Sequence, residues 1–238
     1  MKQGIILAAG CGRRLKEVSI KTPKSLIRVD GVPILERNIQ YMIDSGCVRV
    51  VLIVGYMKER FSYLAEKYQE IIIVDNPDYD STNTVSSMNC ASQYFDCDSF
   101  VTTADIYLRK NLFQKYGDDY SFYLLRPYER FEKPDWVALL DENKRFVNVD
   151  TKAIEGFSYT GISFWKKNDL DYIKQKLSLV DWRNDKERQQ YWDELHIHDY
   201  ESFELRAKIL ENDNEIYEFD DMSDIEKLRK TDSVTIEW

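Results

Sequence analysis

Short apolar runs alternate with segments of helical periodicity through the first part of the chain. Residues 4–9, 48–54 and 71–74 are rich in aliphatic and β-branched side chains, and each run has the length of a buried strand. Residues 34–45 and 58–68 instead place apolar side chains at the spacing of an amphipathic helix. The β-α-β-α-β order predicts an α/β fold with a parallel sheet and right-handed crossovers.

The pattern changes in the second half of the chain. Between about residues 120 and 165, alternating segments predict antiparallel strands that extend the sheet and form a lid or a second binding site. A strand that carries acids, IYEFDD, and a helix, SDIEKLRK, close the chain. Further helices are predicted at residues 168–178, 185–196 and 201–211. We therefore expect a Rossmann-like, mixed but mainly parallel sheet flanked by helices, with an antiparallel extension.

A net charge of −9 argues against nucleic-acid binding, which depends on a surplus of Lys and Arg. Basic residues concentrate between residues 10 and 30, which suits a phosphate, and carboxylates dominate from residue 199 onward, which suits a metal ion. The N-terminal apolar run is too short for a signal peptide or a membrane span, and the cysteines lack CxxC spacing. We expect a cytoplasmic protein that does not bind membranes.

A glycine-rich loop follows the first predicted strand. In LAAGCGRRL, Gly10 and Gly12 let backbone N–H groups approach a polyphosphate without obstruction by side chains. The loop fits neither GxxxxGK(S/T) nor GxGxxG, because residue 15 is Leu, so P-loop and dinucleotide sites are not supported. In a second element, TPKSL at residues 22–26, Pro23 stiffens the chain and presents the ammonium of Lys24 near the loop.

These elements, together with GVPILE at residues 31–36, resemble the start of the nucleotidyltransferase family that makes sugar nucleotides and CDP-alcohols. The resemblance implies that a phosphorylated small molecule attacks the α-phosphate of a nucleoside triphosphate, with Mg²⁺ as the metal. It implies that Lys24 and Arg14 are catalytic and contact phosphoryl oxygens. It assigns nucleotide binding to Leu7, Ala8, Ala9, Gly10, Gly12, Arg13 and Ala104.

Two later segments resemble the bacterial CTP:phosphocholine cytidylyltransferase branch of that family and its phosphonate cytidylyltransferase relatives. In NPDYDSTNTVSS, at residues 76–87, the resemblance gives Asn83 and Ser87 contacts with nucleotide or acceptor. The segment YEFDDMSDIE resembles the ending of the branch. It implies a magnesium site made by Asp105, just after the predicted strand at 99–103, together with Asp220 and Glu218.

The branch also implies CTP as donor and a cationic acceptor, with phosphocholine as the first expectation. Aromatic faces attract a quaternary ammonium, and a carboxylate adds opposite charge. The expected acceptor-binding residues are Trp136, Tyr159, Tyr191, Trp192 and Asp193, and Trp182 offers a further ring. A primary amine such as 2-aminoethylphosphonate would use carboxylates, for which Glu129, Asp135 and Asp193 are available.

Other functions remain open at this point, namely a sugar-1-phosphate nucleotidyltransferase or a regulatory nucleotide-binding subunit without turnover. An acceptor phosphate needs no general base, so His196, His198 and Cys11 are expected to be dispensable for the chemistry. We expect a single domain over residues 1–238, with a nucleotide-binding core at about 1–115 and an acceptor-binding, metal-completing part at about 116–238. A homodimer is possible.

Overall fold

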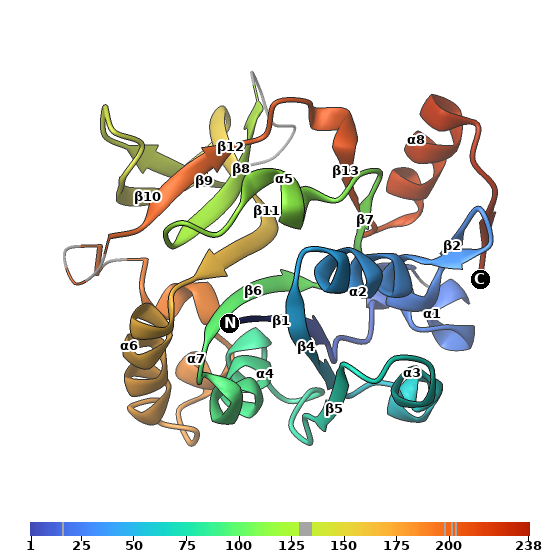
Figure 1. Ribbon diagram of the computed structural model, residues 1–238, viewed down its shortest axis with the longest axis horizontal. Coiled ribbons are helices and arrows are strands. Elements are labelled where there is room, and N and C mark those ends of the chain that lie inside the picture. Colours follow the sequence, from blue (N-terminus) through green and yellow to red (C-terminus); the bar gives the residue numbers. More distant parts are fainter. Residues whose placement is uncertain (16, 129–134, 198, 201, 203) are drawn as a thin grey trace.

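The computed structural model describes residues 1–15, 17–128, 135–197, 199–200, 202 and 204–238. A mixed sheet runs through the molecule in the order β10-β9-β11-β6-β1-β4-β5 (Figure 1). Strand β8 joins it by pairing with β11, and β12 pairs in turn with β8. The bounds of these strands are β1 Lys2–Ala8, β4 Cys47–Val54, β5 Ile71–Asp75, β6 Asp98–Thr103, β8 Phe122–Tyr128, β9 Asp135–Leu140, β10 Phe146–Ala153, β11 Gly156–Trp165 and β12 Arg206–Ile209.

The strands from the N-terminal part of the chain form the parallel part of the sheet, as the apolar runs predict. Strand β1 lies between β4 and β6 and is parallel to both, and β5 adds to β4 in the same direction. Both faces of β1 are buried: Ile6 packs into one apolar cluster and Ile5 into another. Burial on both faces explains why these strands are continuous apolar runs instead of alternating ones.

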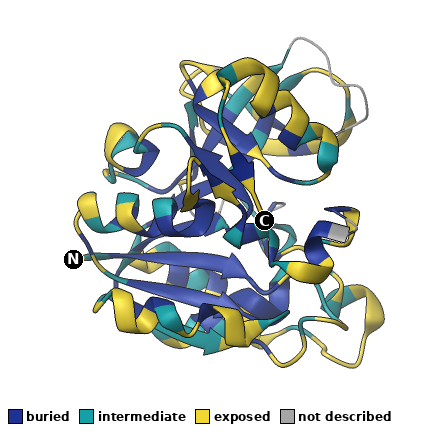
Figure 2. Cartoon of the chain, turned by 90° about the vertical axis from the view of Figure 1, so that its right-hand side faces the viewer, coloured by how far each residue is buried: buried dark blue, intermediate teal, exposed yellow. Residues whose placement is uncertain are grey.

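Helices cover both faces of this sheet, and Figure 2 shows buried strands between helices whose outer surfaces are exposed. α2, α3 and α5 pack against one face, whereas α4 and α6 pack against the other. The described helices are α1 Glu17–Lys21, α2 Ile34–Asp44, α3 Tyr63–Lys67, α4 Thr84–Ala91, α5 Leu112–Tyr116, α6 Lys167–Ser178, α7 Asp185–Arg188 and α8 Met222–Asp232. The α/β class with a mainly parallel sheet is confirmed.

The antiparallel extension is also confirmed, because β11 pairs in antiparallel fashion with β6, β8 and β9, and β9 pairs likewise with β10. The helix predicted at 201–211 is wrong. Its described part contains strand β12, which pairs in parallel with β8. Leu205 and Ala207 are buried there, while Arg206 and Lys208 between and after them remain partly exposed. This alternation belongs to a strand at the edge of the sheet.

Two further predictions of helices need correction. The segment 185–196 contains only the short helix α7 and a 3-10 turn, η5 (Trp192–Leu195), and residues 189–191 between them are not helical. Helix α4 was not predicted. It begins after Asn83, whose side chain accepts a hydrogen bond from the backbone N–H of Thr84.

A third apolar cluster joins the C-terminal segment to the N-terminal part of the chain. Helix α8 packs its buried Ile225 and Leu228 in a cluster with Leu15 and Ile27, beside the small sheet of β2 (Arg28–Val29), β3 (Val32–Pro33) and β14 (Ile236–Glu237). Strand β13 (Ile216–Glu218) pairs with β7 (Ile106–Leu108), which follows β6. These contacts hold the acidic segment after β13 beside the end of β6.

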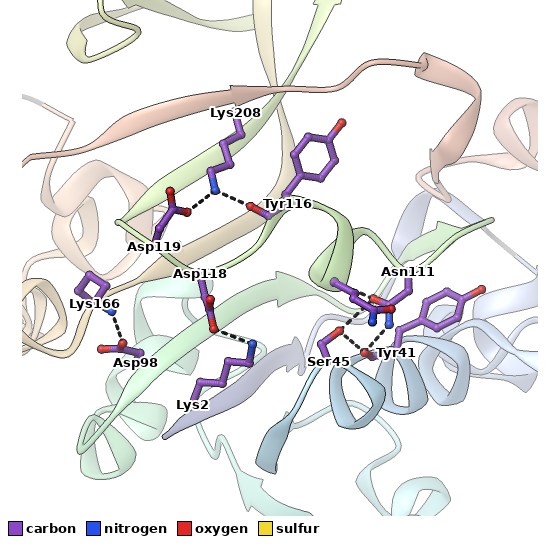
Figure 3. A network of polar contacts seen from close by, with 11 residues as sticks. Lys2, Tyr41, Ser45, Asp98, Asn111, Tyr116, Asp118, Asp119, Lys166 and Lys208 are labelled. Atoms are coloured by element: carbon purple, nitrogen blue, oxygen red, sulfur yellow. Dashed lines mark hydrogen bonds and ion pairs between the residues drawn. The ribbon is translucent and has the colours of Figure 1, made fainter.

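Polar contacts also join the parallel half of the sheet to the segments that follow it (Figure 3). Lys2 at the start of β1 pairs with Asp118 at 2.6 Å, and Lys166 pairs with Asp98 at the start of β6. Asn111 donates a hydrogen bond to the carbonyl of Tyr41 at the end of α2, at 2.9 Å. None of the described helices is both long and apolar enough to cross a membrane.

Candidate functional site

The site forms where β1 and β6 end side by side. The backbone N–H of Ala104 donates to the carbonyl of Leu7 at 3.1 Å, so the glycine-rich loop after β1 and Asp105 after β6 leave the same edge of the sheet. Ligands of open α/β sheets bind outside the carboxyl ends of the strands. Lys24, in the 3-10 turn Lys24–Leu26, reaches this edge and pairs with the carboxylate of Asp105.

Three carboxylates meet at this edge. Asp105, Glu218 and Asp220 can each offer one oxygen such that all three oxygens lie within 4.8 Å of one another. Asp105 is held to the C-terminal segment by its backbone carbonyl, which accepts from the N–H of Phe219 at 2.9 Å. Phe219 is fully buried in the third apolar cluster. Its neighbours Glu218 and Asp220 therefore point away from that cluster, and both lie beside Asp105.

Two cations approach the acidic cluster. Nζ of Lys24 lies 4.0 Å from Oδ1 of Asp220, in addition to its pair with Asp105. Nη1 of Arg14 donates to Oδ2 of Asp220 at 2.8 Å, and this arginine side chain is largely exposed. The sequence placed these two cations and three carboxylates in one site, and the structure brings all five together.

The charges shift one another's proton affinities. Burial is the largest influence on Asp105 and acts to raise its pKa, but the ammonium of Lys24 outweighs it, and the pKa of Asp105 lies below its usual value. Burial acts to lower the pKa of Lys24, yet Asp105 raises that pKa above its usual value. Glu218 keeps an exposed surface, but surrounding protein limits its hydration; this loss of hydration, with repulsion from Asp105 and Asp220, raises its pKa to about 8.

The acidic cluster fits a hard divalent cation. Oδ1 of Asp105 is buried and accepts no hydrogen bond from any residue that the structure describes, so this oxygen is available as a ligand. Carboxylate oxygens are the ligands that Mg²⁺ and Ca²⁺ prefer. The described residues therefore contain an acidic group that could hold a divalent metal ion.

A cavity of about 110 Å³ lies between the glycine-rich loop and α4, and Lys24 and Asp105 line it. Most of the residues predicted to bind nucleotide also line it, namely Leu7, Ala8, Ala9, Gly10, Ser87 and Ala104. Asn83 is not among the lining residues, because its side chain caps α4; Thr84 takes its place in the cavity wall.

Gly12 and Arg13 lie beyond this cavity. Gly12 has a φ of +58°, and a Cβ there would lie 3.3 Å from Cδ of Lys24, so glycine lets the loop fold closely over the lysine. Arg13 and Cys11 line a separate cavity of about 410 Å³ between the loop and Tyr79.

An aromatic cavity of about 290 Å³ adjoins the acidic cluster. Its lining includes all five residues predicted to bind the acceptor: Trp136, Tyr159, Tyr191, Trp192 and Asp193. The ring of Trp136 stands edge-on to Tyr159 and Tyr191, with centroids 6.2 Å and 5.8 Å away. Glu218 lines the same cavity, which joins the aromatic surfaces to the acidic cluster. Trp182 is exposed and does not line this cavity.

Several residues of the site were not predicted. Tyr123 lines the aromatic cavity and donates a hydrogen bond to the carboxylate of Asp193. Arg126 shares a smaller cavity with Glu218 and Asp220, where it acts to lower the pKa of Glu218. Both lie on β8, whose alternating pattern identifies a strand but not which face meets a ligand. Glu129, the side chain of Asp135, and His198 lie outside the described residues.

Residues 4–121 match the profile of the MobA-like NTP transferase domain. The choline-phosphate cytidylyltransferase of Haemophilus influenzae is 32% identical over 225 residues, which cover 92% of this chain and 93% of that protein. This chain belongs to the nucleotidyltransferase family. The choline-phosphate cytidylyltransferase of Streptococcus pneumoniae is 29% identical over 96% of this nucleotidyltransferase and 97% of that protein.

A second substrate class occurs among the relatives. The 2-aminoethylphosphonate cytidylyltransferase of Lancefieldella rimae is 29% identical to this nucleotidyltransferase over 80% of the chain and 77% of that protein. The solved structure of CTP:phosphocholine cytidylyltransferase from Streptococcus pneumoniae matches with a TM-score of 0.88 at 29% identity, covering 96% of this chain and 98% of that chain. The nucleotidyltransferase fold extends over the length of the chain.

Proposed function

We propose that this nucleotidyltransferase transfers CMP from CTP to phosphocholine and releases pyrophosphate. The observation that carries the proposal is the position of Glu218, which lines the aromatic cavity and belongs to the acidic cluster. A molecule with a cationic group in the aromatic cavity would thereby extend its phosphate toward the ends of β1 and β6. Relatives named for phosphocholine, similar over almost the whole chain, support this choice of acceptor.

The reaction needs positioning and charge neutralisation more than proton transfer. A phosphate oxygen of the acceptor attacks the α-phosphorus of CTP, a new P–O bond forms, and the bond to the β-phosphate breaks with departure of pyrophosphate. The attacking oxygen is already an anion, so no base is required. In the proposed site, the ammonium of Lys24 lies close to the reacting phosphates and Arg14 lies at the outer edge, where both reduce repulsion between the anions.

The metal in this proposal is Mg²⁺, held by Asp105, Asp220 and Glu218. The fit rests on the hard oxygen ligands and on the buried Oδ1 of Asp105, for which the described part of the chain offers no hydrogen-bond partner. Bound there, Mg²⁺ would neutralise charge on the phosphates. Lys24 keeps Asp105 ionised, and therefore ready as a ligand, by lowering its pKa.

The aromatic cavity favours a quaternary ammonium over a sugar. Tyr123, Trp136, Tyr159, Tyr191 and Trp192 all contribute rings to its lining. A cation over such a face gains about 0.5–1 kcal/mol at exposed sites and about 2 kcal/mol when water is excluded. A hexose would instead need many hydrogen-bonding side chains. The second candidate acceptor is 2-aminoethylphosphonate, because Asp193 offers the same cavity a carboxylate for a primary amine.

The test is pyrophosphate release with each of the four nucleoside triphosphates against phosphocholine, phosphoethanolamine, 2-aminoethylphosphonate and hexose-1-phosphates. Each pair is assayed with Mg²⁺ and again with excess EDTA. We expect metal-dependent turnover with CTP and phosphocholine. Turnover confined to 2-aminoethylphosphonate would select the second candidate. Turnover confined to a sugar phosphate, or the absence of turnover with every pair, would refute both.

A further inference from the structure

Behind the aromatic cavity, Tyr123 connects Asp193 to His196. The hydroxyl of Tyr123 donates to Oδ1 of Asp193 and lies 3.0 Å from Nε2 of His196. Tyr123 and His196 are almost completely buried, at 2% and 1% exposure, whereas Asp193 is partly exposed toward the cavity. The rings of Tyr123 and His196 are nearly parallel, with centroids 5.9 Å apart. Trp165 and Trp192 pack against the histidine.

The direction of these hydrogen bonds follows from the donors available. An ionised carboxylate can only accept, and a phenol has a single proton, which Tyr123 gives to Asp193. The oxygen of Tyr123 can therefore only accept from His196, so Nε2 of His196 carries the proton. Burial lowers the pKa of His196 to about 3, which keeps the ring neutral. The chain of donors runs from His196 through Tyr123 to Asp193.

This arrangement matters for the choice between acceptor cations. A carboxylate withdrawn from water needs hydrogen-bond donors. A primary ammonium brings N–H donors of its own, but a quaternary ammonium brings none. A site built for a quaternary ammonium must therefore satisfy its carboxylate from within the protein, and the hydroxyl of Tyr123 does this at Asp193.

We propose that Tyr123 is a specificity-determining residue that favours a quaternary over a primary ammonium acceptor, and that His196 is the residue that positions its hydroxyl. The inference rests on the proposed function, since it concerns the acceptor site of that reaction. The hydroxyl of Tyr123 already donates a hydrogen bond to Oδ1 of Asp193, so that oxygen does not need an N–H group from a primary amine. The ring of Tyr123 lines the cavity in which the acceptor cation would lie.

The test compares kcat/KM for phosphocholine with kcat/KM for phosphoethanolamine in the wild type and in Tyr123→Phe. Without the hydroxyl, Asp193 lacks a donor that phosphoethanolamine can replace and phosphocholine cannot. The ratio of the two kcat/KM values, choline over ethanolamine, should fall about tenfold, as expected for one hydrogen bond to a charged group. KM for CTP should not change.

A matched control is Tyr63→Phe, because the hydroxyl of Tyr63 also donates to a carboxylate, that of the buried Glu36, at 2.9 Å and away from this cavity. It should leave the ratio at the wild-type value, whatever it does to stability. His196→Phe retains an aromatic ring but removes the donor, and should lower the ratio in the same direction as Tyr123→Phe. His196→Gln, which can restore an N–H near the position of Nε2, should recover part of it.

The possible failures are distinct. If the wild type does not turn over phosphocholine at all, the proposed function is wrong and the inference is overturned with it. If the wild type uses phosphocholine but Tyr123→Phe lowers kcat/KM for both acceptors equally, the function stands and the specificity role is overturned. Should Tyr123→Phe fail to fold, His196→Phe and His196→Gln provide the test. If the ratio of kcat/KM for phosphocholine to kcat/KM for phosphoethanolamine is the same in both variants as in the wild type, the inference is overturned.

Discussion

Lys24 and Asp105 form an ion pair at the end of the central strands, although they lie on different segments of the chain, 81 positions apart. Asp105 is 5% exposed, so its charge depends on the lysine for compensation. The same lysine lines the cavity beside the glycine-rich loop. This pair therefore joins the proposed triphosphate site to the acidic cluster, and it can be tested from both sides.

Replacing Asp105 by Asn should abolish turnover while the protein remains folded. Asparagine keeps the shape of the side chain but removes the charge that a divalent cation requires. We expect a fall in kcat of at least about 100-fold, the size typical of losing one electrostatic contact at a reacting centre. Pyrophosphate release and circular dichroism provide the measurements. Asp118→Asn, which alters a carboxylate paired with Lys2, is the control and should remain active.

Removing the lysine should destabilise the protein more than removing the pair. Lys24→Ala leaves the carboxylate of Asp105 without its counter-ion, which costs about 3 kcal/mol when a buried pair is broken on one side. The double variant Lys24→Ala with Asp105→Asn should regain part of that stability. Urea unfolding in EDTA measures the free energy of unfolding. If the double variant is less stable than Lys24→Ala alone, the pair does not act as described.

Trp136 should affect the acceptor and not the nucleotide. Trp136→Leu removes the aromatic face while the cavity stays apolar, and we expect KM for phosphocholine to rise about tenfold. Trp136→Phe keeps a ring and should show a smaller rise. KM for CTP should stay constant in both variants. Equal increases in both KM values would place Trp136 outside the acceptor site.

His196 should make the protein sensitive to acid. Its folded pKa of about 3 lies below the ordinary value of 6.5, so the unfolded chain takes up a proton as pH falls below 6.5 while the folded protein does not. Stability from this residue is complete above pH 6.5 and falls between pH 6.5 and 3. Asp193 acts in the opposite direction. It keeps some exposed surface, but the surrounding protein limits its hydration and raises its pKa to about 6, so the folded protein gains its proton first.

Comparison with His196→Phe cancels the contribution of every group that titrates alike in both proteins. The free energy of unfolding of the wild type, minus that of this variant, should fall by about 1.4 kcal/mol for each pH unit below pH 6.5. Urea unfolding at several pH values gives this difference. A constant difference across that range would show that His196 does not remain neutral in the folded protein.

Asn83 should act on helix α4 first and on nucleotide binding only through it. Asn83→Ala removes the cap of α4 and should cost about 1 kcal/mol of stability. Asn83→Ser keeps a capping oxygen and should restore both stability and KM for CTP. If serine restores stability but KM for CTP remains high, the amide of Asn83 contacts the nucleotide directly.

The parts of the fold that could be predicted are those where local pattern and tertiary environment agree. Strands β1 and β4 are buried on both faces, so their apolar runs identified them. The segment 201–211 was misjudged because residues such as Glu204, Leu205 and Ala207 have high helix propensity, and pairing with β8 overrides that preference. Helix α4 was missed because Thr, Ser and Asn dominate it, and its N-cap is its main local signal.

The same distinction applies to the site. Lys24, Asp105 and Asp220 were proposed from short motifs, and the structure brings them together; their roles stay predictions. Tyr123 could not be found in this way, because its partner Asp193 lies 70 positions away and no local pattern links a strand tyrosine to that carboxylate. Hydrogen bonds between distant segments depend on register and sheet order, which periodicity does not specify.

The third apolar cluster has a consequence for the timing of folding. Glu218 and Asp220 reach Asp105 because β13 pairs with β7 and α8 packs against Leu15 and Ile27. During synthesis, Asp105 leaves the ribosome long before these two carboxylates exist. The acidic cluster can therefore be completed only after nearly all of the chain has been made, so a nascent polypeptide that has already formed its parallel sheet still lacks two of the three carboxylates.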